Sequence, residues 1–99
     1  METKEFQKKC TEIVKKLDQK YMVERDPQLS FVQLTEEIGE IAKEINKPRL
    51  RHKQVDRENL EGEFADVFLQ FAILAQIFNV DLEKAVEAKI KILYERHGL

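Results

Sequence analysis

The stretch LEGEFADVFLQFAILAQIF, residues 60–78, decides the fold of this chain. Its apolar residues recur at the three- and four-residue spacing of a helix, at Leu60, Phe64, Val67, Phe71, Leu74 and Phe78. Residues 67–78 are apolar nearly all round this helix. Three neighbouring helices of a small chain can hardly cover such a surface, so we expect a second subunit to cover the rest.

Three further segments show helical periodicity, and no window alternates as a strand does. The expected helices cover residues 3–20, 28–46, 56–78 and 82–97. Pro27 and Pro48 bound the second of them, Asp81 is placed to cap the last, and Gly98 is placed to end it. The basic stretch 47–57 is expected to be a connection. The sequence therefore predicts an all-α fold, a four-helix bundle-like subunit that forms a single domain over residues 1–99 and assembles as a homodimer or a dimer of dimers.

Composition excludes several classes of protein. The chain has 99 residues, of which 42% are hydrophobic and 36% charged, and its net charge is -2. No overall basic field favours nucleic acid as a partner. The longest apolar run, residues 67–78, is too short to cross a membrane, and the N-terminus lacks the apolar run of a signal peptide. A single cysteine, Cys10, cannot form an internal disulfide, so we expect a cytoplasmic protein with no membrane partner.

Two acidic motifs share one position relative to the apolar stripes of their helices. LTEEIGEI, residues 34–41, aligns with LEGEFADV, residues 60–67, so that Glu37 matches Glu63 and Glu40 matches Asp66. At roughly 100° per residue, these four carboxylates lie at the flank of each stripe, whereas Glu36 lies farther towards solvent. If the two helices pack antiparallel through their stripes, the four carboxylates converge. Their repulsion then favours a bound divalent cation.

The donor set indicates which cation is expected. Carboxylate oxygens are hard ligands that suit Mg²⁺, with Mn²⁺ as a possible substitute. A di-iron helical bundle would offer Glu-x-x-His pairs, and neither His52 nor His97 follows a glutamate at that spacing. An acidic, solvated helix face without a site is the alternative for either motif alone, because the chain contains 19 acidic residues.

The paired motifs EExxE at 36–40 and ExxD at 63–66, followed by DLEKAVEAKIKILYER at 81–96, resemble the MazG-like nucleoside triphosphate pyrophosphohydrolases. These belong to the all-α NTP pyrophosphatase superfamily, which is related to the dimeric dUTPases. The resemblance covers about residues 31–96. It implies Mg²⁺-dependent hydrolysis of an NTP or dNTP to the monophosphate and pyrophosphate. It also implies that the metal ligands are Glu37, Glu40, Glu63 and Asp66, and that Glu36 and Glu37 are the catalytic candidates.

Two basic residues of the last expected helix are candidate phosphate ligands. Lys89 falls in an apolar stripe with Leu82, Val86 and Leu93, and Arg96 lies one heptad further on. The resemblance implies that both contact substrate phosphates, and the alternative is that both snorkel along the edge of the bundle. Many relatives carry an asparagine between these two positions, where this chain has Leu93, which puts the local ligand arrangement in question.

Several features stay open from sequence alone. The basic connection 47–57 either adds phosphate contacts or is a solvated loop. Phe31, Gln33 and Tyr21 either contact a nucleobase or belong to the core and its edge. The main alternative to an enzyme is a non-catalytic helical module of the same scaffold that binds metal or nucleotide or mediates assembly. A plain helical interaction protein with a solvated acidic face is a third possibility.

Overall fold

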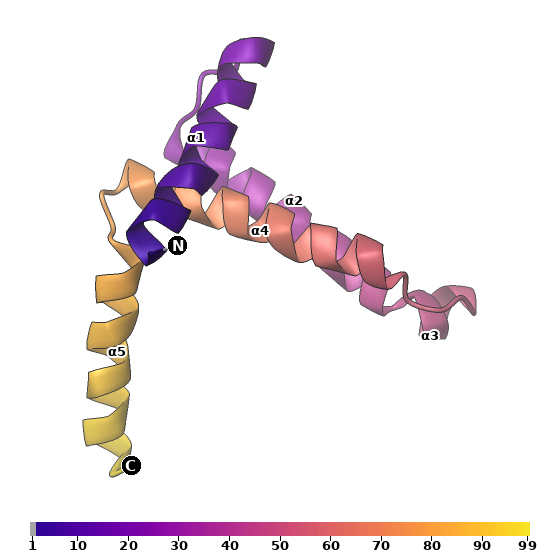
Figure 1. Cartoon of the computed structure of the whole chain (residues 1–99). Coiled ribbons are helices and arrows are strands. Elements are labelled where there is room, and N and C mark those ends of the chain that lie inside the picture. The colour runs from indigo at the N-terminus through magenta and orange to yellow at the C-terminus, as the bar shows by residue number, and fades with distance from the viewer. Residues whose placement is uncertain (1) are drawn as a thin grey trace.

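The structure, a computed structural model, describes residues 2–99 and consists of α-helices joined by short turns (Figure 1). The helices are α1 (Thr3–Tyr21), α2 (Pro27–Ile45), α3 (Lys47–Arg51), α4 (Arg57–Ile77) and α5 (Leu82–His97). Residues 2–99 contain no strand, which confirms the all-α prediction. The short helix α3 was expected to be part of a connection. Pro48 ends α2 as predicted, and it also fits the first turn of α3, where a missing N–H costs nothing.

Aspartate side chains cap the starts of three helices. The carboxylates of Asp26, Asp56 and Asp81 accept hydrogen bonds from the backbone N–H groups three residues further on, at 2.8, 3.1 and 3.1 Å. Such caps satisfy N–H groups that a helix cannot satisfy internally. Gly98, with a φ of 62°, ends α5 in the left-handed conformation. The predicted start and end of α5 are therefore confirmed.

The main packing unit is the antiparallel pair of α2 and α4, which α1 crosses (Figure 1). Within residues 2–99 the buried apolar residues are few: Cys10, Val14, Ala72, Ile73 and Ala75. They come from α1 and from the second half of α4. The second half of α4 is also the most apolar part of the sequence. Because this core is small, much of the apolar surface of the same helices faces outwards.

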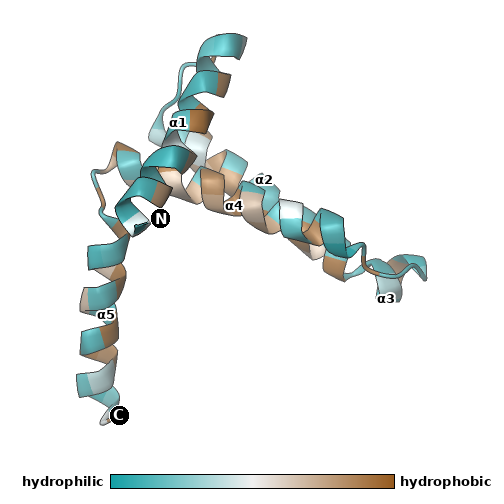
Figure 2. Ribbon diagram, in the orientation of Figure 1, coloured by the Kyte–Doolittle hydropathy of each residue, from teal (hydrophilic) through white to brown (hydrophobic). Residues whose placement is uncertain are grey.

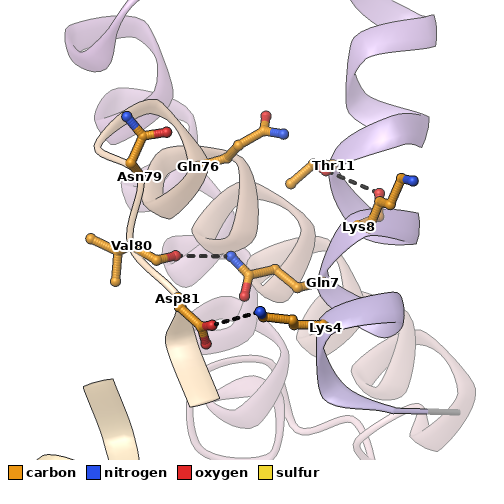
Figure 3. Close-up of a pocket in the computed structure, with 8 residues that line it drawn as sticks. All are labelled: Lys4, Gln7, Lys8, Thr11, Gln76, Asn79, Val80 and Asp81. Carbon is orange, nitrogen blue, oxygen red and sulfur yellow. Dashed lines mark hydrogen bonds and ion pairs between the residues drawn. The ribbon is translucent and has the colours of Figure 1, made fainter. Parts of the chain in front are cut away.

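The turn between α4 and α5 is held by Gln7 of α1 (Figure 3). The Gln7 side chain donates from Nε2 to the Val80 carbonyl at 3.2 Å and accepts at Oε1 from the Leu82 N–H at 3.3 Å. An ion pair at 3.7 Å joins Lys4 to Asp81 beside it. The turn bends α5 by 92° from α4, so α5 leaves the other helices. Within residues 2–99 no single helix is long and apolar enough to span a membrane, and only α4 and α5 counted together reach that length and composition.

The isolated chain is not a compact four-helix bundle, which corrects the expectation for the subunit. Its radius of gyration is 16.4 Å, whereas a compact domain of this length has about 13 Å. Within the chain α5 touches mainly α1, near the turn, and apart from Leu82 at its start every residue of α5 is exposed. Figure 2 shows apolar patches along this projecting helix. The reason is the bend at the turn, which directs the stripe of α5 away from α2 and α4.

Candidate metal centre

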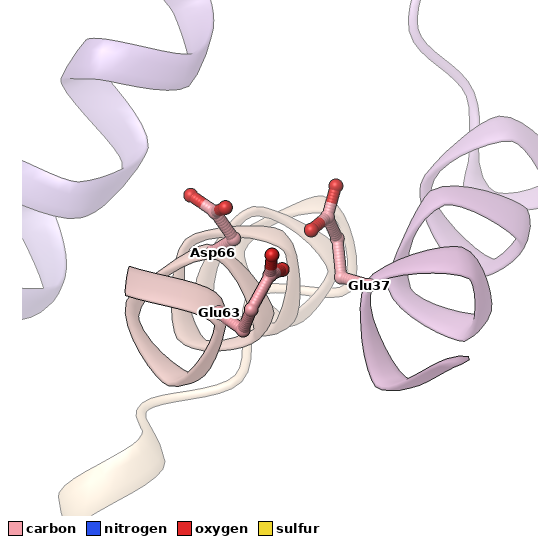
Figure 4. Close-up of side chains that lie close together, drawn as sticks. All are labelled: Glu37, Glu63 and Asp66. Atoms are coloured by element: carbon pink, nitrogen blue, oxygen red, sulfur yellow. The ribbon is translucent and has the colours of Figure 1, made fainter. Parts of the chain in front are cut away.

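Three of the four predicted metal ligands converge between α2 and α4. Ligand atoms of Glu37, Glu63 and Asp66 all lie within 4.8 Å of one another. Glu37 comes from α2, while Glu63 and Asp66 stand one turn apart on α4, and the three carboxylates point to the same side (Figure 4). We call this group the acidic cluster. The convergence predicted from the matched phase of the two motifs is therefore present for these three residues.

The other two predicted acids lie outside the acidic cluster. Glu40 is exposed and is not within the 4.8 Å group, although it is close enough to act on the charge of Glu37. Glu36 is exposed as well and has the weakest influence of the neighbouring acids on Glu37. The sequence expected Glu36 to lie towards solvent, and the structure places it there.

The electrostatics of the acidic cluster show that it is short of positive charge. Partial burial raises the pKa of Glu37, and the negative charges of Asp66, Glu63, Glu40 and Glu36 raise it further. Both causes disfavour the ionised carboxylate. A cation bound here would counteract the repulsion between the carboxylates, because it attracts each of the negative charges.

The geometry fits a small divalent cation once the side chains draw together. In an octahedral Mg²⁺ shell with bonds of about 2.1 Å, neighbouring oxygen ligands lie about 3 Å apart, and only opposite ones reach about 4.2 Å. Three ligands of one shell form at least two neighbouring pairs, so carboxylates that lie within 4.8 Å of one another must close by as much as roughly 1.8 Å, which rotation of side chains on fixed helices supplies. Glu63 and Glu37 are partly buried and Asp66 is exposed, so the remaining positions of the shell open towards solvent and substrate. The acidic cluster therefore fits a divalent cation that shares its shell with water or phosphate.

Glu44, one turn beyond Glu40 on α2, does not extend the acidic flank. Its side chain is buried at 2% exposure and accepts hydrogen bonds from Lys47 Nζ at 2.8 Å, the Asp56 N–H at 2.9 Å and Asn59 Nδ2. The hydrogen bond from Lys47, followed by that from the Asp56 N–H, lowers the pKa of Glu44 to about 2. At neutral pH Glu44 is therefore an ionised link that ties the end of α2 to α3 and to the start of α4.

A cleft of about 440 Å³ between α1, α2 and α4 adjoins the acidic cluster, since Glu37 and Asp66 both line it. Its other charged residues are Arg25 and Asp18. Arg25 donates to Asp18 from Nε at 2.6 Å and from Nη2 at 2.9 Å, and it also donates to Ser30 Oγ at 3.0 Å. Sequence reasoning did not identify this largely buried ion pair, because Asp18 lies in α1, Arg25 lies in the connection that follows α1, and neither belongs to a motif.

The two predicted phosphate ligands lie apart from the acidic cluster. Lys89 and Arg96 are exposed residues of α5, which projects away from α2 and α4 (Figure 1). The sequence expected α5 to pack beside the acidic helices of the same chain. Within one chain α5 therefore does not bring these basic residues to the acidic cluster.

Within residues 2–99 the structure is therefore all-helical, with a cluster of carboxylates between two antiparallel helices that is compatible with binding of a divalent cation. The family model of the MazG nucleotide pyrophosphohydrolase domain matches residues 25–98, and the chain belongs to this family. No curated protein and no solved structure gives a significant match. Helix α1 lies before the matched residues, although it forms one wall of the cleft.

Proposed function

We propose that this protein hydrolyses a nucleoside triphosphate, NTP or dNTP, to the nucleoside monophosphate and pyrophosphate with Mg²⁺ as cofactor. The observation that carries the proposal is the acidic cluster, in which Glu37, Glu63 and Asp66 from two helices lie within 4.8 Å. Membership of the MazG nucleotide pyrophosphohydrolase family supports the same reaction class. The reaction adds one water across a phosphoric anhydride bond and releases the two phosphate products.

Each acid of the two motifs has a defined part in this proposal. Glu37, Glu63 and Asp66 hold the cation, and Glu40 joins them by a change of rotamer, since it is exposed on the same helix as Glu37. A bound Mg²⁺ supplies neutralisation of the charge that develops on the transferred phosphoryl group. Glu36 and Glu37 are the candidates for orienting the attacking water and accepting its proton.

A second copy of the chain completes the site in this proposal. Large apolar side chains on α2, on α4 and its C-cap, and on α5 are exposed in the single chain: Phe31, Ile38, Phe64, Phe71, Phe78, Val86, Ile90 and Leu93. A monomer with so much exposed apolar surface and so small a core has little to stabilise it. We therefore propose a homodimer or a dimer of dimers in which α5 of one copy packs on the α2 and α4 pair of another. Lys89 and Arg96 then reach substrate phosphates from the neighbouring copy.

Pyrophosphate release from a panel of NTPs and dNTPs tests the proposed function. The wild-type protein with Mg²⁺ should release pyrophosphate from at least one nucleotide, and Asp66→Asn should abolish the release. Orthophosphate and a nucleoside diphosphate as products would contradict the proposal. If Mg²⁺ raises the melting temperature but no nucleotide yields pyrophosphate, the non-catalytic module of the same scaffold is the correct description.

A further inference from the structure

Helix α5 contacts the rest of its chain close to its own first turn. Within residues 2–99 it touches mainly α1, and beyond Leu82 every one of its residues is exposed. The apolar side chains of α5 therefore do not fix its direction within one chain. That direction, bent by 92° from α4, depends on the turn at residues 78–81 and on the groups that contact this turn.

Gln7 of α1 contacts this turn with both ends of its side-chain amide. Its Nε2 atom donates to the Val80 carbonyl at 3.2 Å, and Figure 3 shows the side chain crossing from α1 to the turn. Its Oε1 atom accepts from the Leu82 N–H at 3.3 Å. The Leu82 N–H is one of the first N–H groups of α5, which have no partner inside the helix. The amide of glutamine suits this position because it donates and accepts at the same time.

The two hydrogen bonds of Gln7 span the point at which the chain changes direction. Before this point, the Val80 N–H donates to the Ala75 carbonyl at 2.9 Å, which ties the turn back to α4. After it, the side chain of Asp81 caps the start of α5. The backbone dihedrals of Val80 and Asp81 then set the direction of α5 relative to α4. Gln7 restrains them, because it bonds to the backbone on both sides of Asp81.

A small rotation at the turn displaces the far end of α5 by several ångströms. Lys89 and Arg96 stand 7 and 14 residues after Leu82, which at about 1.5 Å per residue puts them roughly 10 and 21 Å along the helix. A rotation of about 10° at the turn therefore moves Lys89 by roughly 2 Å and Arg96 by roughly 4 Å. A hydrogen bond to a phosphate oxygen spans about 3 Å, so displacements of this size break it. Both basic residues need a fixed turn in order to meet a phosphate.

We propose that Gln7 is a positioning residue, which fixes the direction of α5 so that Lys89 and Arg96 reach phosphates bound at the neighbouring copy. The inference rests on the proposed function, including its assembly of two or more copies. Gln7 precedes the residues that the family model matches, so a segment outside the matched region orients α5. The ion pair between Lys4 and Asp81 at 3.7 Å contributes less, because the Lys4 side chain is 71% exposed.

Spin-label distances test the orientation of α5 without depending on turnover. Nitroxide labels on Glu61→Cys in α4 and Glu95→Cys in α5 report the distance between the two helices, once Cys10, the single native cysteine, is replaced by Ala. Ile90→Glu is included to weaken the proposed assembly, and an excess of unlabelled protein keeps the measured distances within one chain. Double electron–electron resonance should show one narrow distribution with Gln7 in place. Gln7→Leu, which is similar in size but forms no side-chain hydrogen bond, should broaden or displace it.

Self-association and activity of the otherwise unmodified chain test the consequence. Gln7→Leu should raise the Kd for self-association by roughly 5- to 50-fold, as expected for two lost hydrogen bonds. At protein concentrations that keep the variant assembled, kcat/KM for pyrophosphate release should fall by a similar factor. The rise in Tm with Mg²⁺ should stay unchanged, because Gln7 lies outside the acidic cluster. Gln19→Leu, the same substitution on the exposed face of α1, is the matched control and should change none of these quantities.

Equal label distances for Gln7→Leu and Gln19→Leu would overturn the proposal, and so would a wild-type kcat/KM in a Gln7→Leu chain whose α5 has moved. If circular dichroism shows that Gln7→Leu is unfolded, Gln7→Asn takes its place, since a side chain one methylene shorter cannot reach both groups of the turn. Altered distances and weaker self-association, with no pyrophosphate from any nucleotide even in the wild type, would overturn the proposed hydrolysis and support the orientation of α5 by Gln7.

Discussion

Replacing Glu37 by Gln removes one negative charge from the acidic cluster and leaves the size of the side chain nearly unchanged. At the dielectric constant of water, two unit charges at the 4.8 Å limit of the acidic cluster repel each other by roughly 0.9 kcal/mol. Glu37 has two such neighbours, Glu63 and Asp66, and salt screens part of the repulsion. We therefore expect Glu37→Gln to stabilise the metal-free protein by about 1 kcal/mol at pH 7.

The sign follows from the raised pKa of Glu37. A carboxyl group whose pKa is higher in the folded state contributes stability below its unfolded pKa, near 4.3, and that contribution is lost as pH rises through the folded value. At pH 7 the ionised Glu37 therefore opposes folding, and glutamine does not. In a domain of this length, 1 kcal/mol corresponds to roughly 4–8 °C in Tm.

Thermal melts in EDTA and in excess Mg²⁺ at one protein concentration measure both halves of this prediction. In EDTA the variant should melt above the wild type. With Mg²⁺ at about 100 times its Kd, the wild type should gain roughly 2.7 kcal/mol, and the variant should gain much less. The order of the two melting temperatures should therefore reverse. Glu36→Gln is the control, because Glu36 lies outside the acidic cluster. A variant that melts below the wild type in EDTA would refute the account of the acidic cluster.

Three further predictions concern other parts of the chain. Glu44→Gln should lower Tm by roughly 5 °C at pH 7. Because the pKa of Glu44 is lowered to about 2, its stabilising effect is present above the unfolded pKa, and melts at decreasing pH should show the difference from wild type vanish as pH falls towards 2. Sedimentation equilibrium of the wild type should show an assembly larger than a monomer. Ile90→Glu, a substitution on the exposed helix α5, should shift the equilibrium towards the monomer. A wild-type monomer at micromolar concentration would contradict the proposed assembly. Asp66→Asn and Lys89→Ala should each abolish activity. If Lys89 acts from the neighbouring copy, an equal mixture of the two variants after subunit exchange should contain about a quarter of the active sites of the wild type. No recovery would place Lys89 in the same chain as its acidic cluster, or outside the site.

Much of the helical structure could be predicted because it depends on local rules. The bounds of α5 follow from a capping aspartate and a terminal glycine, both visible in the sequence. The convergence of Glu37 with Glu63 and Asp66 was predictable as well, since two helices that pack through their apolar stripes bring matched flanks together. Periodicity and phase are enough for these features.

The features that sequence reasoning missed depend on register and on long-range contacts. Aligning the two motifs in sequence pairs Glu44 with Gln70, but in the antiparallel pair Glu44 meets Asn59 at the start of α4. Glu44 is consequently a buried structural carboxylate. The direction of α5 depends on Gln7, which lies more than seventy residues before the turn that it holds. The sequence predicted that the four helices pack as one bundle, which is their simplest arrangement. The bend after α4 excludes this bundle within one chain.

The most direct measurement of the central claim follows the products of the best nucleotide by ³¹P NMR in the presence of Mg²⁺. The account predicts one nucleoside monophosphate for each pyrophosphate, no nucleoside diphosphate, and no reaction in EDTA or with Asp66→Asn. Turnover that persists in Asp66→Asn, or products that are a diphosphate and orthophosphate, would contradict it.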